Sequence, residues 1–122
     1  MTVKPESVDL DQVRKRLLSD RTETTRLRDG LAHDVANVMA ASRDVATDDE
    51  HDPEGATIAY ERERTSALVD RADAHLDDIR IALARLDEGT YARCERCGRE
   101  ISAERLEARP VARRCLSCAS AG

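Results

Sequence analysis

Four cysteines near the C-terminus constrain the fold of this chain more than any other feature. Cys94 and Cys97 form one C-x2-C pair, Cys115 and Cys118 form a second, and 17 residues separate the two pairs. Each pair can supply two thiolates from one tight turn, so the spacing predicts a tetrahedral zinc site with four cysteine ligands. Gly98 directly follows the first pair, where a residue free to adopt positive φ allows the turn to close. This interpretation uses every cysteine of the chain.

Other uses of the cysteines would be a redox-active pair, disulfides, or an iron-sulfur cluster held by four thiolates. Disulfides need an oxidising compartment, yet residues 1–12 are acidic and contain no apolar stretch typical of a secretory signal. We therefore expect a cytoplasmic, reduced protein. Four protein ligands leave no open position on the metal, so we expect one structural zinc ion and no enzymatic activity.

The composition limits the size of any hydrophobic core. The 122 residues include no Trp, no Phe and two Tyr, and 37% of them are charged. A chain of this kind needs stabilisation from a metal or from long helices packed along a seam. No apolar stretch approaches the roughly 18 residues of a membrane span, so no membrane partner is expected.

Two segments show apolar residues at steps of three, four or seven, the spacing of a helical stripe. The first stripe consists of Leu10, Val13, Leu17, Thr24, Leu27, Leu31, Val38 and Val45. The second, which is more regular, consists of Ile58, Val69, Ala72, Leu76, Ile79, Leu83 and Leu86. Asp9 with Gln12 is typical of a helix start, and Glu88-Gly89-Thr90 is typical of a helix end.

Turn-forming residues collect between the two helical segments, and a connection this short folds two long helices back on each other. The expected fold is mainly α: a long antiparallel helical hairpin, or coiled coil, with a small C-terminal four-cysteine zinc-finger head. We expect a tail at 1–8, a hairpin at 9–89 with an acidic tip at 46–55, a finger at 90–120 and a tail at 121–122. Each arm of about 35 residues would extend roughly 50 Å.

The charge of the chain is uneven. Residues 1–90 contain 13 Lys and Arg and 21 Asp and Glu, whereas residues 91–122 contain 7 Arg and 4 Glu. The formal charges are thus −8 and +3, and zinc held by four thiolates would bring the finger close to neutral. Specific DNA binding needs a concentrated positive face, so we do not expect it.

Acidic residues concentrate in the predicted tip and just before it. They are Asp44, Asp48, Asp49, Glu50, Asp52 and Glu54. Such oxygen ligands suit a Mg²⁺ site or a basic channel in a partner. The alternative is a solvated capping loop, because Asp52-Pro53-Glu54 is also a favourable helix start, with Asp52 as the N-cap.

The segment 89–101, GTYARCERCGREI, followed by RLEARP at 105–110 and the second cysteine pair, resembles the DksA/TraR-type four-cysteine zinc-finger family. The hairpin with an acidic tip extends this resemblance more loosely over most of the chain. The resemblance implies a protein that binds bacterial RNA polymerase and inserts its hairpin through the secondary channel toward the catalytic Mg²⁺. It implies an effect on promoter complexes without specific contact to DNA.

The tip departs from the family pattern Asp-Pro-x-Asp-x-Ala. The chain reads DPEGAT at 52–57, so that Asp52 matches the first acid and Gly55 stands in place of the second. Asp49 or Glu54 could replace the missing carboxylate. The resemblance therefore assigns contact with the polymerase active centre to Asp52, Asp49 and Glu54.

The family also binds the alarmone guanosine tetraphosphate through basic side chains. Arg71 matches one of these positions, but Asp78 and Ala119 stand where lysines are expected. A polyphosphate gains little from an acid and an alanine. We therefore expect weak or no dependence on the alarmone, and assign no alarmone-binding residue.

The sequence thus predicts a DksA/TraR-like transcription regulator that acts on RNA polymerase. The alternative is a zinc-finger interaction adaptor whose hairpin binds another protein.

Overall fold

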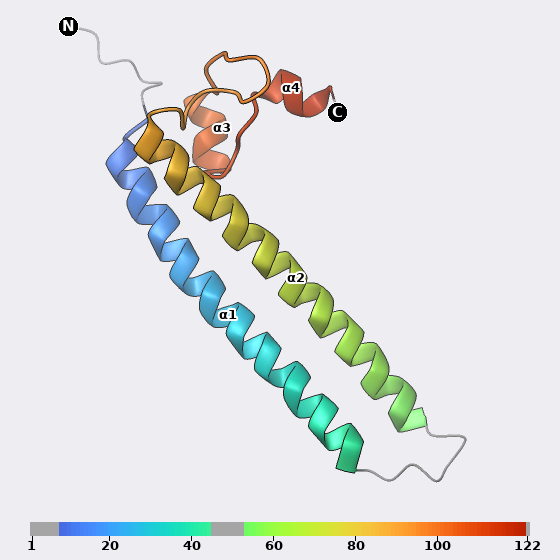
Figure 1. Ribbon diagram of the computed structural model, residues 1–122. Coiled ribbons are helices and arrows are strands. Elements are labelled where there is room, and N and C mark those ends of the chain that lie inside the picture. Colours follow the sequence, from blue (N-terminus) through green and yellow to red (C-terminus); the bar gives the residue numbers. More distant parts are fainter. Residues whose placement is uncertain (1–7, 45–52, 122) are drawn as a thin grey trace, which may run out of the picture. The chain divides into compact units, whose positions relative to one another are not determined.

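The computed structural model describes residues 8–44 and 53–121, and these residues form four helices (Figure 1). The helices are α1 (Leu10–Asp44), α2 (Pro53–Glu88), α3 (Ala103–Ala108) and α4 (Leu116–Ser120). The described residues contain no strand, only an isolated antiparallel bridge between Arg93 and Glu100. Two long helices followed by a short cysteine-containing segment confirm the mainly α fold, a helical hairpin with a C-terminal finger.

Side-chain and backbone caps set the ends of the long helices. At the start of α1, the Asp9 carboxylate accepts hydrogen bonds from the backbone N–H groups of Asp11 and Gln12, at 3.1 and 3.2 Å. At the end of α2, Gly89 adopts a φ of 78°, and the Thr90 N–H donates to the Arg85 carbonyl at 2.9 Å. This is a glycine-dependent helix stop of the Schellman kind. Both predicted boundaries are confirmed.

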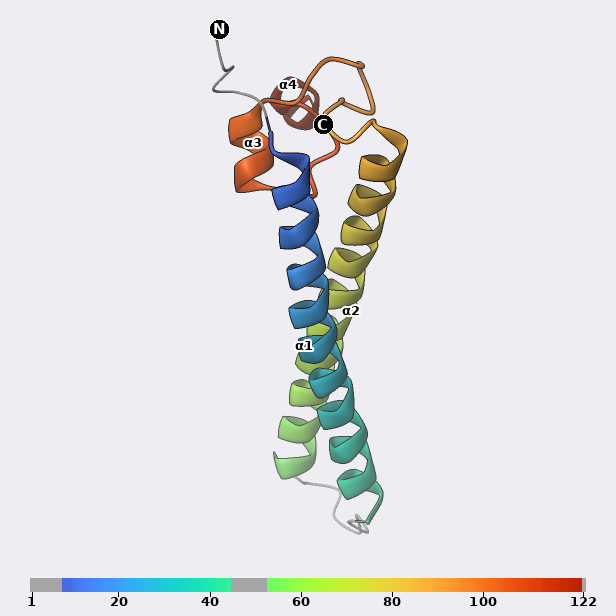
Figure 2. The ribbon, with the colours of Figure 1, turned by 90° about the vertical axis from the view of Figure 1, so that its left-hand side faces the viewer.

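The chain divides into two compact units, each containing parts of both long helices. Unit 1 contains the start of α1, the end of α2 and the finger, through residue 21 and from residue 77 onward; unit 2 contains residues 22–76. Within each unit, α1 and α2 lie side by side and run in opposite directions (Figures 1 and 2). An ion pair joins the helices in each unit, Arg14 with Asp87 in unit 1 and Arg28 with Asp73 in unit 2, both at 2.9 Å.

The hydrophobic core is concentrated in unit 1. Leu17 of α1 is 1% exposed, and Ile79 and Leu86 of α2 are also buried. Among the described residues of unit 2, only Ala72 is buried to the same degree, and the rest of its seam is half-buried. The second predicted stripe is thus largely confirmed, and Ala82, which the prediction did not include, belongs to the same core.

The first predicted stripe is wrong in part, because Leu27 is 60% exposed. The seam steps four residues from Thr24 to Arg28, not three, and continues at Leu31 and Val35, which are half-buried. Arg28 tolerates this position because its guanidinium pairs with Asp73 of α2. Leu10 is also exposed, at 47%. The side chain of Val38, and Val45 entirely, lie outside what the structure describes.

Over the described ranges, the chain offers no helix of the length and apolar character that crossing a membrane requires.

Leu17→Ala is expected to lower the free energy of unfolding by about 2–5 kcal/mol, because it leaves a cavity in the unit 1 core. The same change at the exposed Leu27 is the matched control and should alter stability by less than about 0.5 kcal/mol. Denaturant unfolding of the zinc-loaded protein, followed by circular dichroism, measures both values. Equal losses for the two variants would contradict the seam described above.

Candidate metal centre

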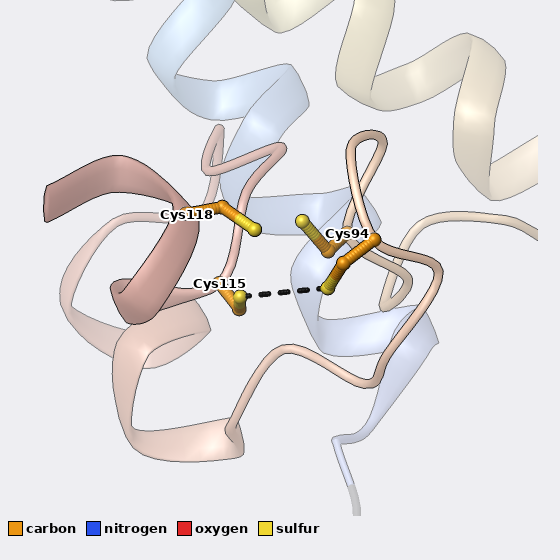
Figure 3. Close-up of side chains that lie close together, drawn as sticks. Cys94, Cys115 and Cys118 are labelled. Carbon is orange, nitrogen blue, oxygen red and sulfur yellow. Dashed lines mark hydrogen bonds between the residues drawn. The ribbon is translucent and has the colours of Figure 1, made fainter. Parts of the chain in front are cut away.

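The four cysteine thiols converge at one point of the finger. Their Sγ atoms all lie within 4.8 Å of one another, and the Cys97 and Cys115 sulfurs are 3.8 Å apart. Figure 3 shows the thiols of Cys94, Cys115 and Cys118 pointing toward a common centre. Four sulfurs bound to one zinc ion at about 2.3 Å in tetrahedral geometry would lie about 3.8 Å apart. The quartet is therefore compatible with one structural zinc ion.

A tight turn presents the first cysteine pair. Gly98 adopts a φ of 76° and its N–H donates to the Cys94 carbonyl at 3.0 Å, as the sequence predicted for this glycine. The Cys94 N–H donates to the Arg99 carbonyl at 2.8 Å, and the Ile101 N–H donates to the Ala92 carbonyl at 2.7 Å. These bonds fold the segment back on itself and place both sulfurs on the inner side of the turn.

The second pair lies at the start of a short helix. Cys115 is the N-cap residue of α4, and Cys118 lies within the helix, so both thiols face the same side. The Glu95 N–H donates to the Arg113 carbonyl at 2.8 Å, which joins the two cysteine segments directly. An ion pair between Arg114 and Glu95 at 3.2 Å lies beside this bond.

The helix α3 connects the two cysteine pairs. The Ser102 hydroxyl accepts a hydrogen bond from the Arg105 N–H at 3.2 Å and caps its start. Leu106 on its inner face is 1% exposed. The helix ends at Ala108, and Pro110 follows two residues later.

The apolar side chains of the finger are buried to different degrees. Ile101 and Leu106 are buried and Val111 is half-buried, but Leu116 is 66% exposed. Leu116 follows Cys115 in α4, and a residue one position along a helix points about 100° away from its neighbour, so it cannot face the cluster with the cysteines.

Tyr91 contributes to the core in a way that the sequence reasoning missed. Its side chain is 2% exposed, and its hydroxyl donates to the Pro110 carbonyl at 2.6 Å. Burial raises the pKa of the Tyr91 phenol, and the nearby charges of Arg16 and Arg85 oppose this only partly. The available signal was an aromatic residue just after a helix stop, in a chain with two aromatic residues in total.

The thiols have different pKa values. Burial would raise the pKa of Cys94, but backbone hydrogen bonds from Cys115, Cys97 and Arg96 outweigh burial and lower it to about 6. The hydrogen bond with Cys115, together with burial, raises the pKa of Cys118 to about 12. Since zinc binds thiolates, metal binding must displace the Cys118 proton at any physiological pH.

Two of the finger's arginines form ion pairs within unit 1. Arg113 lies 3.6 Å from Asp78 of α2, and Arg114 pairs with Glu95. The structure describes little of the predicted tip residues. Asp49 and Asp52 lie outside the described residues, and Glu54 lies in the first turn of α2, with a side chain that is not described.

The structure thus defines a class: a helical hairpin whose paired ends share a compact unit with a four-thiolate finger. The family model of the prokaryotic dksA/traR C4-type zinc finger matches residues 89–121. Residues 89–121 are therefore a DksA/TraR-type four-cysteine zinc finger, and the resemblance seen in the sequence is confirmed.

Similar proteins share more than the finger. The uncharacterized protein YteA of Bacillus subtilis is 47% identical over 64 residues, which is 52% of this chain and 27% of YteA. The RNA polymerase-binding transcription factor DksA of Haemophilus influenzae is 41% identical over 49 residues, 40% of this chain and 34% of that protein. The structure of transcription factor DksA2 from Pseudomonas aeruginosa matches with a TM-score of 0.75 at 26% identity, covering 91% of this chain and 80% of that one. The chain therefore spans less than half the length of these curated relatives, while the structural match extends over both long helices.

Zinc affinity is expected to fall as the pH is lowered, because protons compete with zinc for the thiolates. The loss should steepen below about pH 6, where Cys94 also becomes protonated. Competition with a chromophoric chelator between pH 5 and pH 8 measures this dependence. An affinity that does not change over this range would contradict a site made of four thiolates.

Proposed function

We propose that this chain is a DksA/TraR-like transcription regulator that binds RNA polymerase. The finger at residues 89–121 supports this proposal, together with a structural match to a transcription factor over 91% of the chain. One of the similar proteins carries RNA polymerase binding in its name. In the proposed mechanism, the hairpin enters the secondary channel of the polymerase and modulates transcription initiation. This activity belongs in the cytoplasm.

The metal has a structural role in this proposal. Four cysteines complete the coordination of zinc, so the metal would fold the finger and offer no open position for a substrate. The chain would therefore act on the chemistry of another protein without being an enzyme itself. The residues that carry this effect would lie in the acidic tip, where Asp52, with Asp49 or Glu54, would approach the active centre of the polymerase.

Specific DNA binding is not part of the proposal. The basic excess of the finger is small, and Arg113 and Arg114 are committed to Asp78 and Glu95. Phosphate contacts need uncommitted positive charge on one face. Contact with DNA would therefore be indirect, through the polymerase.

We also expect weak dependence on guanosine tetraphosphate, because of the residues at two positions near Arg113. Asp78 and Ala119 line one cleft of about 310 Å³ together with Arg105, Arg109, Arg113 and Arg114, and the Asp78 carboxylate lies 3.6 Å from Arg113. A polyphosphate would have to displace this pairing and would gain no lysine at either position. Adding the alarmone to the transcription assay described below is expected to leave the effect of the protein unchanged.

The proposal predicts that the zinc-loaded chain co-purifies with core RNA polymerase at micromolar concentration. A transcript-cleavage factor with a similar hairpin should compete, because both would occupy the secondary channel. Failure to bind at micromolar protein would contradict the proposal. Binding that the cleavage factor does not displace would favour the alternative, a zinc-finger interaction adaptor that uses another surface.

Asp52→Ala should leave zinc content and polymerase affinity nearly unchanged and abolish the effect on transcription initiation. Asp52→Asn separates charge from capping, because asparagine caps a helix about as well as aspartate, whereas loss of a cap costs about 0.5–2 kcal/mol. If the carboxylate acts at the active centre, both variants fail in a transcription assay. If Asp52 is only a cap, Asp52→Asn retains full activity, and this result would refute the proposed role.

A further inference from the structure

Two side chains of unit 1, Arg16 of α1 and Arg85 of α2, connect the helix ends to the finger, and Tyr91 connects two parts of the finger. Each of them donates hydrogen bonds to backbone carbonyls of the finger or of the segment leading into it. The position of each carbonyl depends on the fold of the backbone, so these hydrogen bonds can form only when the backbone of the finger is folded.

Arg16 caps the end of α3. Its Nη1 donates to the Glu107 carbonyl at 2.7 Å. Glu107 lies in the last turn of α3, where carbonyls have no partner within the helix. A guanidinium at this position supplies the missing donor and also opposes the negative end of the helix dipole. This contact exists only when α3 is folded between the two cysteine pairs.

Arg85 makes the corresponding contact from α2. Its Nη2 donates to the Thr90 carbonyl at 2.8 Å and also to the Arg93 carbonyl. Arg93 immediately precedes Cys94 and pairs with Glu100 in the antiparallel bridge of the first cysteine turn. The end of α2 is therefore bonded to the backbone that presents the first zinc ligand.

Tyr91 completes this set from a buried position. The phenol hydroxyl donates to the Pro110 carbonyl at 2.6 Å, between α3 and the second cysteine pair. The side chain is 2% exposed, as deeply buried as Leu17 of α1 and Leu106 of α3. A buried hydroxyl needs a partner, so displacement of residue 110 would leave an unsatisfied donor in the core.

We propose that Arg16, Arg85 and Tyr91 are positioning residues that couple zinc binding to the order of the paired helix ends. Zinc fixes the two cysteine segments and with them α3, and so places the carbonyls to which the three side chains donate. The coupling is reciprocal, so the same contacts favour zinc binding. The seam of unit 2 contains none of these contacts among its described residues and would keep its order without the metal.

Hydrogen exchange of the full chain, with and without a zinc chelator, tests this coupling directly. After zinc removal, amides in residues 10–21 and 77–88 should lose protection about tenfold or more, in line with the loss of charged hydrogen bonds. Amides in residues 60–72 should change less than about twofold. Equal loss in both regions, or no loss at the helix ends, would overturn the proposal.

Arg16→Ala should weaken zinc binding by about tenfold in a chelator competition, because coupling acts in both directions. Arg14→Ala is the matched control: Arg14 lies on the same helix and makes an exposed ion pair with Asp87, whose loss should change zinc affinity less than about twofold. Tyr91→Phe removes only the hydroxyl and tests the coupling if Arg16→Ala does not fold. Equal zinc affinities for Arg14→Ala and for the Arg16 and Tyr91 variants would refute the coupling. None of these measurements depends on polymerase binding.

Discussion

The convergence of four thiols within the finger is the constraint on which the rest of the structure depends. The finger has a small core and contains only short helices, so its backbone would gain little stability from packing alone. Structural zinc binding contributes about 10–16 kcal/mol in small domains, so the metal would supply a large share of the stability of the finger. The metal site therefore decides whether α3, α4 and the turn at Gly98 have a defined structure.

The metal site also bears on how the buried apolar side chains are distributed between the two units. The buried apolar side chains are concentrated where the helix ends share a unit with the finger, and the seam of unit 2 is small and partly polar, with Thr24 and Arg28 at positions of a coiled-coil core. Polar seam residues are less favourable than leucines but specify how the helices pair. Stability and proposed activity are thus assigned to different parts of one chain: the buried core is concentrated in unit 1, and the proposed activity is assigned to the acidic residues between the two long helices.

The sequence predicted the features that follow from residue spacing. It did not predict which side chain occupies a contested seam position, or which side chains contact carbonyls distant in sequence. The cysteine pattern, the turn at Gly98 and the helix stop at Gly89 are local, and each is present as predicted. Leu27 was assigned to the seam by hydrophobicity, but an ion pair allows Arg28 to occupy that position. Tyr91 and Arg16 were missed because their partners are carbonyls distant in sequence, which no periodic pattern reveals. Asp49 and Asp52 of the acidic tip lie outside the described residues, and their roles stay predictions.

The central claim is that one zinc ion, held by all four cysteines, organises the finger and the paired helix ends. X-ray absorption at the zinc edge, combined with metal analysis of the purified full chain, tests this claim most directly. The account predicts one zinc per chain and a first shell of four sulfurs at about 2.3 Å. Nitrogen or oxygen in that shell, a stoichiometry well below one, or a folded finger that contains no zinc would contradict it.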